Sequence, residues 1–381
     1  MLSKNNSHKT WLEISKKALL HNFNVFQKIV GKEVKVVPVV KANAYGHDLI
    51  QVVSVLKNRT GIFAVDNIEE ALTIRKISKD TRVIILGYII SKNFKSAVEN
   101  NFSFVVYRLD VLKQIVSLKL NKKASVHLKI ETGLNRQGVG GKELVRILDY
   151  IIKHDDQIFL EGVYTHFANV EDTLDSSYAI NQLKRFNESL KIIKLKGFKI
   201  PVIHTAASAA TFLLKDSHFG TVRAGIGLYG LWPSRETKIA SVSRKMKIIL
   251  KPVLSWKSIV VQVKEIQKGE TVGYGRTWTA RRRSRIAIVP VGYSDGFDRK
   301  LSNIGKVIVG NSFAPVIGRV AMNMIMIDVT DSKRVKADQT VIIIGTKGKL
   351  SISAEDIAEK IGTINYEVVS RINPLLPRII V

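Results

Sequence analysis

The chain has 381 residues, a length at which two domains are expected, and a hydrophobic fraction of 45% that is ordinary for a globular protein. It contains no cysteine, which excludes disulfides and thiolate metal ligands, and no apolar run near the roughly 18 residues that span a bilayer, so we expect a cytoplasmic protein without a membrane partner. The formal net charge is +28, but the lysines are spread along the whole chain, a pattern that favours a solvated surface over a specific nucleic-acid site.

Strand-like and helix-like segments alternate over the first part of the chain. A short strand at residues 11–14 and a helix between Ser15 and Gly31 come first. Eight strand-like runs follow, at residues 34–40, 62–65, 82–86, 104–106, 125–130, 160–165, 200–204 and 221–223. Amphipathic segments lie between them, for example at residues 67–78, 109–120, 142–153 and 178–195. Eight alternations with short connections predict an α/β fold, a (β/α)8 TIM-type barrel, which we place at residues 1–240.

The pattern changes beyond Pro233, where helical periodicity fades. Short strand runs separated by glycine-containing turns are expected at residues 248–250, 258–263, 285–291, 307–309, 324–329 and 341–344. A late helix at residues 353–361 carries Ser353 and Asp356 at capping spacing and stops at Gly362. We therefore predict a mostly β C-terminal domain over residues 241–381, with which the first 14 residues can pack.

Lys41 stands where the first barrel strand ends, in the stretch V-V-K-A-N-A-Y-G-H-D. A continuous valine-rich run before a polar, glycine-bearing turn is typical of a strand buried on both faces. The carboxyl end of such a strand is where barrels bind ligands and carry out chemistry. The segment alone leaves two interpretations open, a surface lysine and a catalytic amine.

A second lysine, Lys129, is expected inside the barrel. Strand alternation sends His127 and Lys129 to the face opposite Val126 and Leu128. A buried amine has a lowered pKa and needs an anion, a neutral state or a covalent modification, although a salt bridge to a neighbouring carboxylate is the simpler interpretation. Arg136, after the next turn, can bind a carboxylate through two parallel hydrogen bonds.

The last barrel strands are each followed by polar groups or glycines. The candidates are His166, His204, Ser208, Arg223, Gly225 and Ile226. The loops after strands seven and eight are the usual phosphate site of such barrels, which singles out Ser208, Gly225 and Ile226. For each histidine taken alone, a core residue satisfied by a backbone group is the alternative.

The second domain contains four motifs in which polar or aromatic groups lie mostly beside turn glycines. They are V-G-Y-G-R-T-W (272–278), V-G-Y-S-D-G-F (291–297), G-R-V-A-M-N-M (318–324) and N-Y-E (365–367). A tyrosine at a strand end is often only an amphipathic rim residue. Together with V-V-K-A-N-A-Y-G-H, H-L-K-I-E-T-G-L-N-R-Q-G-V, H-T-A-A-S-A-A and R-A-G-I-G-L-Y-G, the ordered set resembles the PLP-dependent, fold-type-III alanine racemases over nearly the whole chain.

The resemblance implies pyridoxal 5'-phosphate (PLP) as cofactor, no metal, alanine as the small-molecule substrate, and two-base racemisation between L- and D-alanine. Lys41 would form the Schiff base with PLP and serve the D-face, while Tyr274 would serve the L-face from the neighbouring subunit of a homodimer. Arg223 would face the pyridine nitrogen and His166 would tune Tyr274. The phosphate would be held by Tyr45, Ser208, Gly225, Ile226 and Tyr366.

The same resemblance assigns the substrate to Arg136, to the Met322 amide of the other chain, and to Tyr293. Lys129 matches a position that is carbamylated in many members. One departure stands out: the block after Met322 usually continues with aspartate, and here Asn323 follows, which removes a negative charge near the substrate.

Three alternatives stay open at this point. The enzyme can be a racemase of broader specificity, for example acting on serine. A PLP decarboxylase of the same barrel class usually offers an acidic residue to the pyridine nitrogen, so Arg223 argues against it. The third alternative is a non-catalytic PLP carrier. Such proteins resemble a lone barrel, whereas here a β domain with tyrosine-containing motifs follows the barrel. Whether the D-alanine serves peptidoglycan synthesis or the reaction serves alanine catabolism is not fixed by the sequence, nor is the cause of the high net charge.

Overall fold

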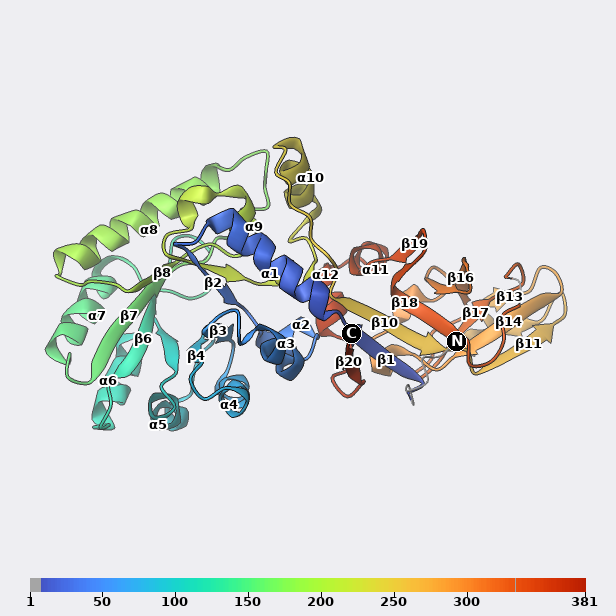
Figure 1. Ribbon diagram of the computed structural model, residues 1–381, viewed down its shortest axis with the longest axis horizontal. Helices are drawn as coiled ribbons and strands as arrows, with labels where there is room; N and C mark the ends of the chain where they lie inside the picture. Colours follow the sequence, from blue (N-terminus) through green and yellow to red (C-terminus); the bar gives the residue numbers. More distant parts are fainter. Residues whose placement is uncertain (1–7, 333) are drawn as a thin grey trace. The chain divides into compact units, whose positions relative to one another are not determined.

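The structure, a computed structural model, describes residues 8–332 and 334–381. Contacts divide the chain into two compact units (Figure 1). The barrel unit comprises Leu19–Ala44 and Leu49–Lys251. The β unit comprises the described residues up to Ala18, together with Tyr45–Asp48 and Pro252–Val381.

The barrel unit is built on eight parallel strands, which confirms the predicted (β/α)8 barrel. In spatial order they are β2 (Lys35–Pro38), β9 (Thr221–Ala224), β8 (Val202–His204), β7 (Ile158–Tyr164), β6 (Ala124–Lys129), β5 (Ser103–Val106), β4 (Arg82–Ile85) and β3 (Ile62–Val65). The ends of this sheet meet through a parallel bridge between Val39 and Ala64, and the Val40 amide donates to the Ala64 carbonyl at 2.8 Å. The sheet therefore closes on itself just before Lys41.

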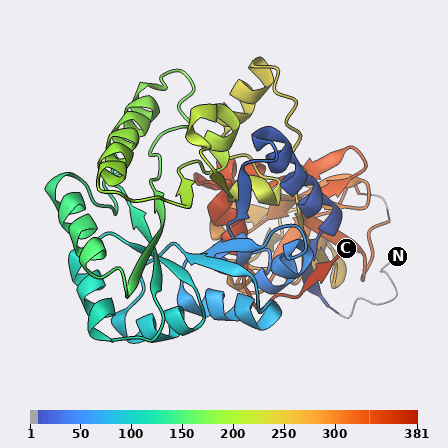
Figure 2. The same ribbon diagram turned by 60° about the vertical axis from the view of Figure 1, so that its left-hand side comes forward.

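Helices cover the outside of these strands (Figure 2). They are α1 (Lys16–Val30), α3 (Leu49–Leu56), α4 (Ile68–Ile77), α5 (Phe94–Glu99), α6 (Leu109–Ser117), α7 (Gly141–Lys153), α8 (Ser177–Leu195), α9 (Ser208–Leu213) and α10 (Arg235–Ser243). In α7 the residues spaced by three and four, Leu144, Ile147, Leu148 and Ile151, are all buried. Burying each such side chain stabilises the fold by about 1.5–3 kcal/mol before entropy is subtracted. Among the described residues no helix has both the length and the hydrophobicity needed to cross a bilayer.

The β unit is a mostly antiparallel sheet with two short helices, as predicted for a mostly β domain. Its strand order is β11 (Gln262–Ile266), β14 (Ser284–Val289), β17 (Ile325–Asp328), β16 (Ser312–Ile317), β15 (Lys306–Val309), β18 (Thr340–Lys347), β10 (Leu254–Ile259), β1 (Thr10–Ile14) and β20 (Arg378–Ile380), with β19 (Leu350–Ile352) on β18. A separate ribbon joins β12 (Thr271–Val272) to β13 (Trp278–Thr279), and the helices are α11 (Ala354–Ile361) and α12 (Asn365–Ser370). The predicted cap of α11 is confirmed, since Ser353 and Asp356 form a capping box and Gly362 ends the helix with φ 73°.

Two predicted strands were wrong. Residues 248–250 form no strand, because side chains of α1 bind the backbone groups of this segment. His21 Nε2 lies 2.8 Å from the Ile249 carbonyl oxygen. The Asn22 side chain donates to the Lys251 carbonyl and accepts from the Lys251 amide, both at 2.8 Å. Residues 258–263 are the end of one strand and the start of another. The partner changes there, since the Val260 amide donates to Gln339 and the Val261 amide to Ile288.

Candidate active site

Lys41 lies directly after β2, at the carboxyl end of the barrel, and opens an unusual turn. Residues 42–45 all have φ between 52° and 54°, the left-handed region. Each non-glycine residue there costs about 1–2 kcal/mol. Hydrogen bonds hold the turn: the Asn43 side chain accepts from the Leu49 amide at 2.8 Å, and the Asn43 amide donates to Glu70 Oε1 at 3.3 Å. Backbone strain of this kind is typical of functional sites.

The Lys41 amine is accessible, because 42% of its side chain is exposed. Its Nζ lies 4.0 Å from Asp66 Oδ1 at the end of β3. An accessible amine at the carboxyl edge of a barrel can condense with an aldehyde.

Arg223 on β9 is buried and tightly held. Its Nη1 lies 2.5 Å from His204 Nδ1 and donates to the His204 carbonyl at 2.9 Å. Its Nη2 donates to the Thr165 and Thr205 carbonyls at 3.0 and 2.8 Å and lies 3.2 Å from His166 Nδ1. A guanidinium has only donors and keeps its charge, so both imidazole nitrogens must be acceptors.

The loops after β8 and β9 meet at Ser208. Its Oγ accepts from the Gly225 and Gly227 amides, both at 3.2 Å, and Ile226 begins the short 3-10 helix Ile226–Tyr229 between them. The structure thus brings the hydroxyl and the glycine turn of the predicted phosphate site together. Their binding role stays a prediction.

Lys129 is buried at the end of β6, with its Nζ 3.2 Å from Gln137 Oε1 and 5.6 Å from the centre of the Tyr164 ring. Burial, followed by the charges of Arg136 and Arg223, lowers the pKa of Lys129 to about 8. Among the described residues no ion pair of Lys129 is found, and its amine donates to the Gln137 side chain.

Arg136 lies on a turn that a carboxylate organises. Glu131 Oε1 accepts from the Gly133 amide at 2.6 Å. Burial acts to raise the pKa of Glu131, but bonds from the amides of the following turn outweigh it and the pKa is lowered. The ionised carboxylate therefore fixes the backbone on which Arg136 is carried, with its side chain exposed.

His166 is half-buried at the end of β7 and is neutral. Burial lowers the pKa of its imidazole to about 3, helped by the charges of Arg223, Arg136, Lys129 and Lys41. Because Nδ1 accepts from Arg223, the proton lies on Nε2. The charges of Arg223, Arg136, Lys129 and Lys41 thus all act on this end of the barrel.

The remaining predicted residues belong to the β unit. Tyr274 opens a 3-10 helix (Tyr274–Arg276) between glycines with positive φ, and its exposed fraction is 73%. Met322 is 56% exposed, and its carbonyl accepts from the Ser294 amide and hydroxyl at 3.0 and 2.8 Å. The same hydroxyl accepts from Asn323 Nδ2 at 2.7 Å. Tyr45 and Tyr366 stand close, with ring centres 6.2 Å apart.

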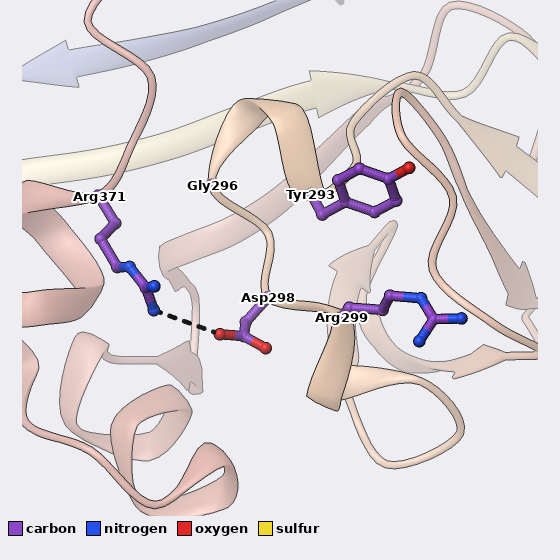
Figure 3. Close-up of a pocket in the computed structure, with 5 residues that line it drawn as sticks. All are labelled: Tyr293, Gly296, Asp298, Arg299 and Arg371. Atoms are coloured by element: carbon purple, nitrogen blue, oxygen red, sulfur yellow. Dashed lines mark ion pairs between the residues drawn. The ribbon is translucent and has the colours of Figure 1, made fainter.

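The β unit also contains a pocket of about 470 Å³, drawn in Figure 3. Its lining residues are Tyr293, Gly296, Asp298, Arg299 and Arg371. The Arg371 side chain points to Asp298, with 3.7 Å between Nη1 and Oδ2 (Figure 3). Of the predicted site residues, Tyr293 lines this pocket.

Sequence reasoning missed several residues that hold the barrel site. Gln182, buried on α8, donates to Thr132 Oγ1 and the His166 carbonyl at 3.1 and 3.3 Å and accepts from the Ala168 amide at 2.8 Å. It thereby ties the Arg136 loop to the His166 loop. The available signal was a polar residue on the buried face of an amphipathic helix. Tyr164 was also missed, because it was read only as a residue of the predicted strand. Its ring lies under both Lys129 and Arg223.

The groups at the end of the barrel fit PLP, the cofactor implied by the sequence. An accessible amine suits its aldehyde, a hydroxyl beside turn amides suits its phosphate, and a buried guanidinium suits a ring nitrogen that accepts a hydrogen bond. The surplus of cations at the same place suits both the phosphate and a substrate carboxylate.

Comparison with known proteins gives a consistent result. Two family models match the chain, "Alanine racemase, N-terminal domain" at residues 14–233 and "Alanine racemase, C-terminal domain" at residues 253–380. The chain is 38% identical to an alanine racemase of Leptospira interrogans over 384 aligned positions, covering 100% of this chain and 97% of the relative. It is 38% identical to alanine racemase 1 of Caldanaerobacter subterraneus subsp. tengcongensis, covering 97% of this chain and 94% of that one. The crystal structure of alanine racemase from Bacillus anthracis with bound L-Ala-P matches with a TM-score of 0.92 and 32% identity, over 99% of this chain and 96% of that one.

Proposed function

The chain belongs to the alanine racemase family, and from that premise we propose how its own residues interconvert L- and D-alanine. Alanine racemases are PLP-dependent isomerases that act on an amino acid. The observation that carries the assignment of residues is a group of cations at the carboxyl end of the barrel. Arg223 lies 3.2 Å from His166 and shares the Tyr164 ring with Lys129, and the charges of Lys41 and Arg136 also act on His166. This group supplies an amine for the cofactor and positive charge for the phosphate and the substrate carboxylate.

When bound, PLP makes the Cα–H of the amino acid acidic enough to be removed. Racemisation then needs one group on each face of the α-carbon, each able to take or give a proton. We assign Lys41 to the D-face and Tyr274 to the L-face. Tyrosine titrates near pH ~10 in water, so Tyr274 needs a hydrogen-bond partner, and the proton that His166 carries on Nε2 suits this role.

The cofactor would be held by Lys41, Tyr45, Ser208, Gly225, Ile226 and Tyr366. Arg223 would face the pyridine nitrogen. Because a guanidinium keeps its proton, it offers that nitrogen a hydrogen bond and no full positive charge, which limits the build-up of carbanion character and favours racemisation over side reactions. The five contacts of Arg223 with backbone carbonyls and imidazole nitrogens fix it in place for this task.

The substrate carboxylate would be bound by Arg136, the Met322 amide and Tyr293. Lys129 is assigned as a carbamate, formed when the neutral amine attacks the carbon of CO2 and releases one proton. The lowered pKa supports this, because the neutral amine is present near pH 8. The product is an anion, which suits the neighbouring Arg136 better than an ammonium group does.

The active unit would be a homodimer in which each chain gives Tyr274 and Met322 to the site of the other. Their exposed fractions of 73% and 56% suit residues that complete the site of a second copy.

A cytoplasmic location, and a role in peptidoglycan supply or alanine breakdown, stay predictions. Fractionation and rescue of D-alanine auxotrophy test them.

The test of the function is made on the purified chain with PLP. We expect visible absorption from bound PLP and formation of D-alanine from L-alanine. Lys41→Ala should lose both the absorption and the activity, whereas Lys57→Ala, at an exposed lysine of the barrel unit, should lose neither. A colourless wild-type protein that stays inactive with added PLP would contradict the proposal.

A further inference from the structure

A line of buried polar side chains crosses the barrel interior behind Arg223. His204 on β8 and His127 on β6 are both fully buried, and His127 Nδ1 lies 2.9 Å from His204 Nε2. Beyond them, His127 Nε2 lies 3.4 Å from Glu161 Oε2 on β7. The line thus runs Arg223, His204, His127, Glu161, and the proposed function uses only its first member.

Glu161 ends this line near the amino-terminal end of the strands. Its carboxylate forms an ion pair with Arg82 and accepts from the Ser103 hydroxyl, and these two residues are the first of β4 and β5. Only 9% of the Glu161 side chain is exposed, whereas 46% of the Arg82 side chain is exposed. A buried carboxylate is therefore balanced by a cation that reaches the surface.

Both histidines are neutral. Burial, then the charges of Arg82 and Arg223, lowers the pKa of His127 to about 3. Burial also lowers the pKa of His204 well below its usual value, again with help from Arg223. A neutral imidazole has one donor and one acceptor nitrogen, so each ring must adopt one of two tautomers.

The donors dictate which tautomer each ring takes. Arg223 donates to His204 Nδ1, so the His204 proton is on Nε2 and points at His127 Nδ1. His127 then carries its proton on Nε2, which faces the Glu161 carboxylate. Among the described residues that buried nitrogen has no hydrogen-bond partner, and the Glu161 carboxylate oxygen 3.4 Å away is the anion that its N–H faces. Each N–H along the line from Arg223 to Glu161 therefore points at a lone pair or an anion.

Packing keeps both rings from turning away. A Cβ at Gly162 would lie 2.4 Å from His127 Nδ1, so the ring occupies space that only glycine leaves free. His204 stacks on Tyr164 with ring centres 4.6 Å apart and an angle of 3° between the planes. With the rings held in place, the tautomers are the remaining freedom in the line.

We propose that Glu161 is a positioning residue that sets the tautomers of His127 and His204 and thereby holds a lone pair against Arg223. In the opposite arrangement His204 would aim an N–H at a guanidinium N–H, which would push Arg223 away from its place. The link from Arg223 to the pyridine nitrogen rests on the proposed function. The assignment of the two histidine tautomers does not depend on that function.

The first test reads the tautomers in the full-length wild-type protein with PLP. Histidine labelled with ¹⁵N shows in long-range ¹⁵N–¹H correlation spectra which ring nitrogen carries the proton. We expect His127 and His204 to be neutral at pH 7 and protonated only on Nε2. A proton on Nδ1 of either residue, or a charged ring, overturns the proposal.

The second test changes the end of the line. Glu161→Gln keeps the shape but can donate to His127 Nε2, which favours the wrong tautomer. We expect a second set of signals for both histidines, a changed visible absorption of bound PLP, and kcat lower by about 10- to 100-fold, the usual loss when the partner behind a functional ligand is changed. Glu143→Gln makes the same chemical change on the surface of α7 and should leave all three unchanged.

A folded Glu161→Gln protein with wild-type tautomers and wild-type kcat contradicts the proposal. The wild-type spectrum can contradict the proposal by itself, so the proposal stays falsifiable even if the Glu161→Gln variant fails to fold. Failure of the proposed function looks different: a protein that binds no PLP and forms no D-alanine still shows its histidine tautomers.

Discussion

Cationic side chains at the end of one barrel differ in chemistry because their surroundings differ. Arg223 is surrounded by carbonyl and imidazole acceptors and stays a fixed charge. Lys129 is equally buried, and this burial, helped by the charges of Arg136 and Arg223, lowers its pKa to about 8. Lys41 is partly exposed and faces Asp66. Arg223 therefore suits the orientation of a ligand, Lys129 suits covalent modification, and Lys41 suits proton transfer.

Lys129 should carry a carbamate whose occupancy rises with pH up to about 8 and beyond, because only the neutral amine reacts with CO2. A ¹³C NMR spectrum in ¹³CO2-equilibrated buffer should show the carbamate in wild type and lose it in Lys129→Ala. Loss of the anion beside Arg136 should also raise the KM for alanine. An unmodified mass and spectrum across this pH range would refute the assignment.

Tyr274→Phe should reduce racemisation by about 10²- to 10⁴-fold, the usual contribution of a general acid or base, while PLP absorption is retained. Removing a hydroxyl from an exposed side chain should not disturb the fold. Tyr88→Phe, at another exposed tyrosine, is the matched control and should keep full activity. Normal rates in both directions for Tyr274→Phe would remove this residue from the mechanism.

At the scale of single elements, the turn after β2 contradicts local preference. Four successive non-glycine residues, 42–45, take left-handed values of φ, although such residues adopt them only as isolated exceptions. The bonds made by Asn43 with Leu49 and Glu70 supply the compensation. The turn is thus held by bonds between its own Asn43 and residues outside it, and not by the φ preferences of residues 42–45.

Ala42→Gly should therefore stabilise the protein, the reverse of the usual effect. Relief of about 1–2 kcal/mol of strain exceeds the roughly 0.5–1 kcal/mol that glycine costs through the unfolded chain, and Ala42 is exposed, so no packing is lost. Ala240→Gly in the ordinary helix α10 should destabilise by about 1 kcal/mol. Thermal unfolding midpoints that fall for both variants would show that the turn is not strained.

The sequence predicted elements whose signal is periodic and failed where tertiary contacts decide. All eight barrel strands and the capped helix α11 were expected. The apolar residues 248–250 resembled a strand, but Asn22 and His21 occupy their backbone groups. Glu161 was hidden inside an apolar strand run, since nothing local indicates that Arg82 will neutralise it. The roles of the site residues came from the resemblance and stay to be tested.

For the whole molecule, the buried histidines predict sensitivity to acid. His127 and His166 have pKa values of about 3 when folded, against 6.5 for an ordinary histidine. Between these values the unfolded chain binds more protons, so stability is full above pH 6.5 and is lost as the pH falls toward 3. The net charge of +28 adds repulsion in the same direction.

Unfolding in urea at pH 5 should take up about one proton for each of these histidines, measurable by pH-stat titration. His166→Gln should lower the uptake by about one proton relative to wild type. This comparison cancels the contribution of all other groups. Equal uptake by the two proteins would mean that His166 is already protonated in the folded state.

Strand β1 has a consequence for how the chain is made. Its residues 10–14 pair with β10 on one side and β20 on the other, through registers such as Leu12 with Trp256 and with Arg378. The ribosome must therefore synthesise the entire barrel before the first partner of β1 emerges. Until then Trp11, Leu12 and Ile14, all buried in the finished fold, stay exposed as a nascent apolar segment. Such a segment is a natural substrate for chaperones, while the barrel can begin to fold during translation.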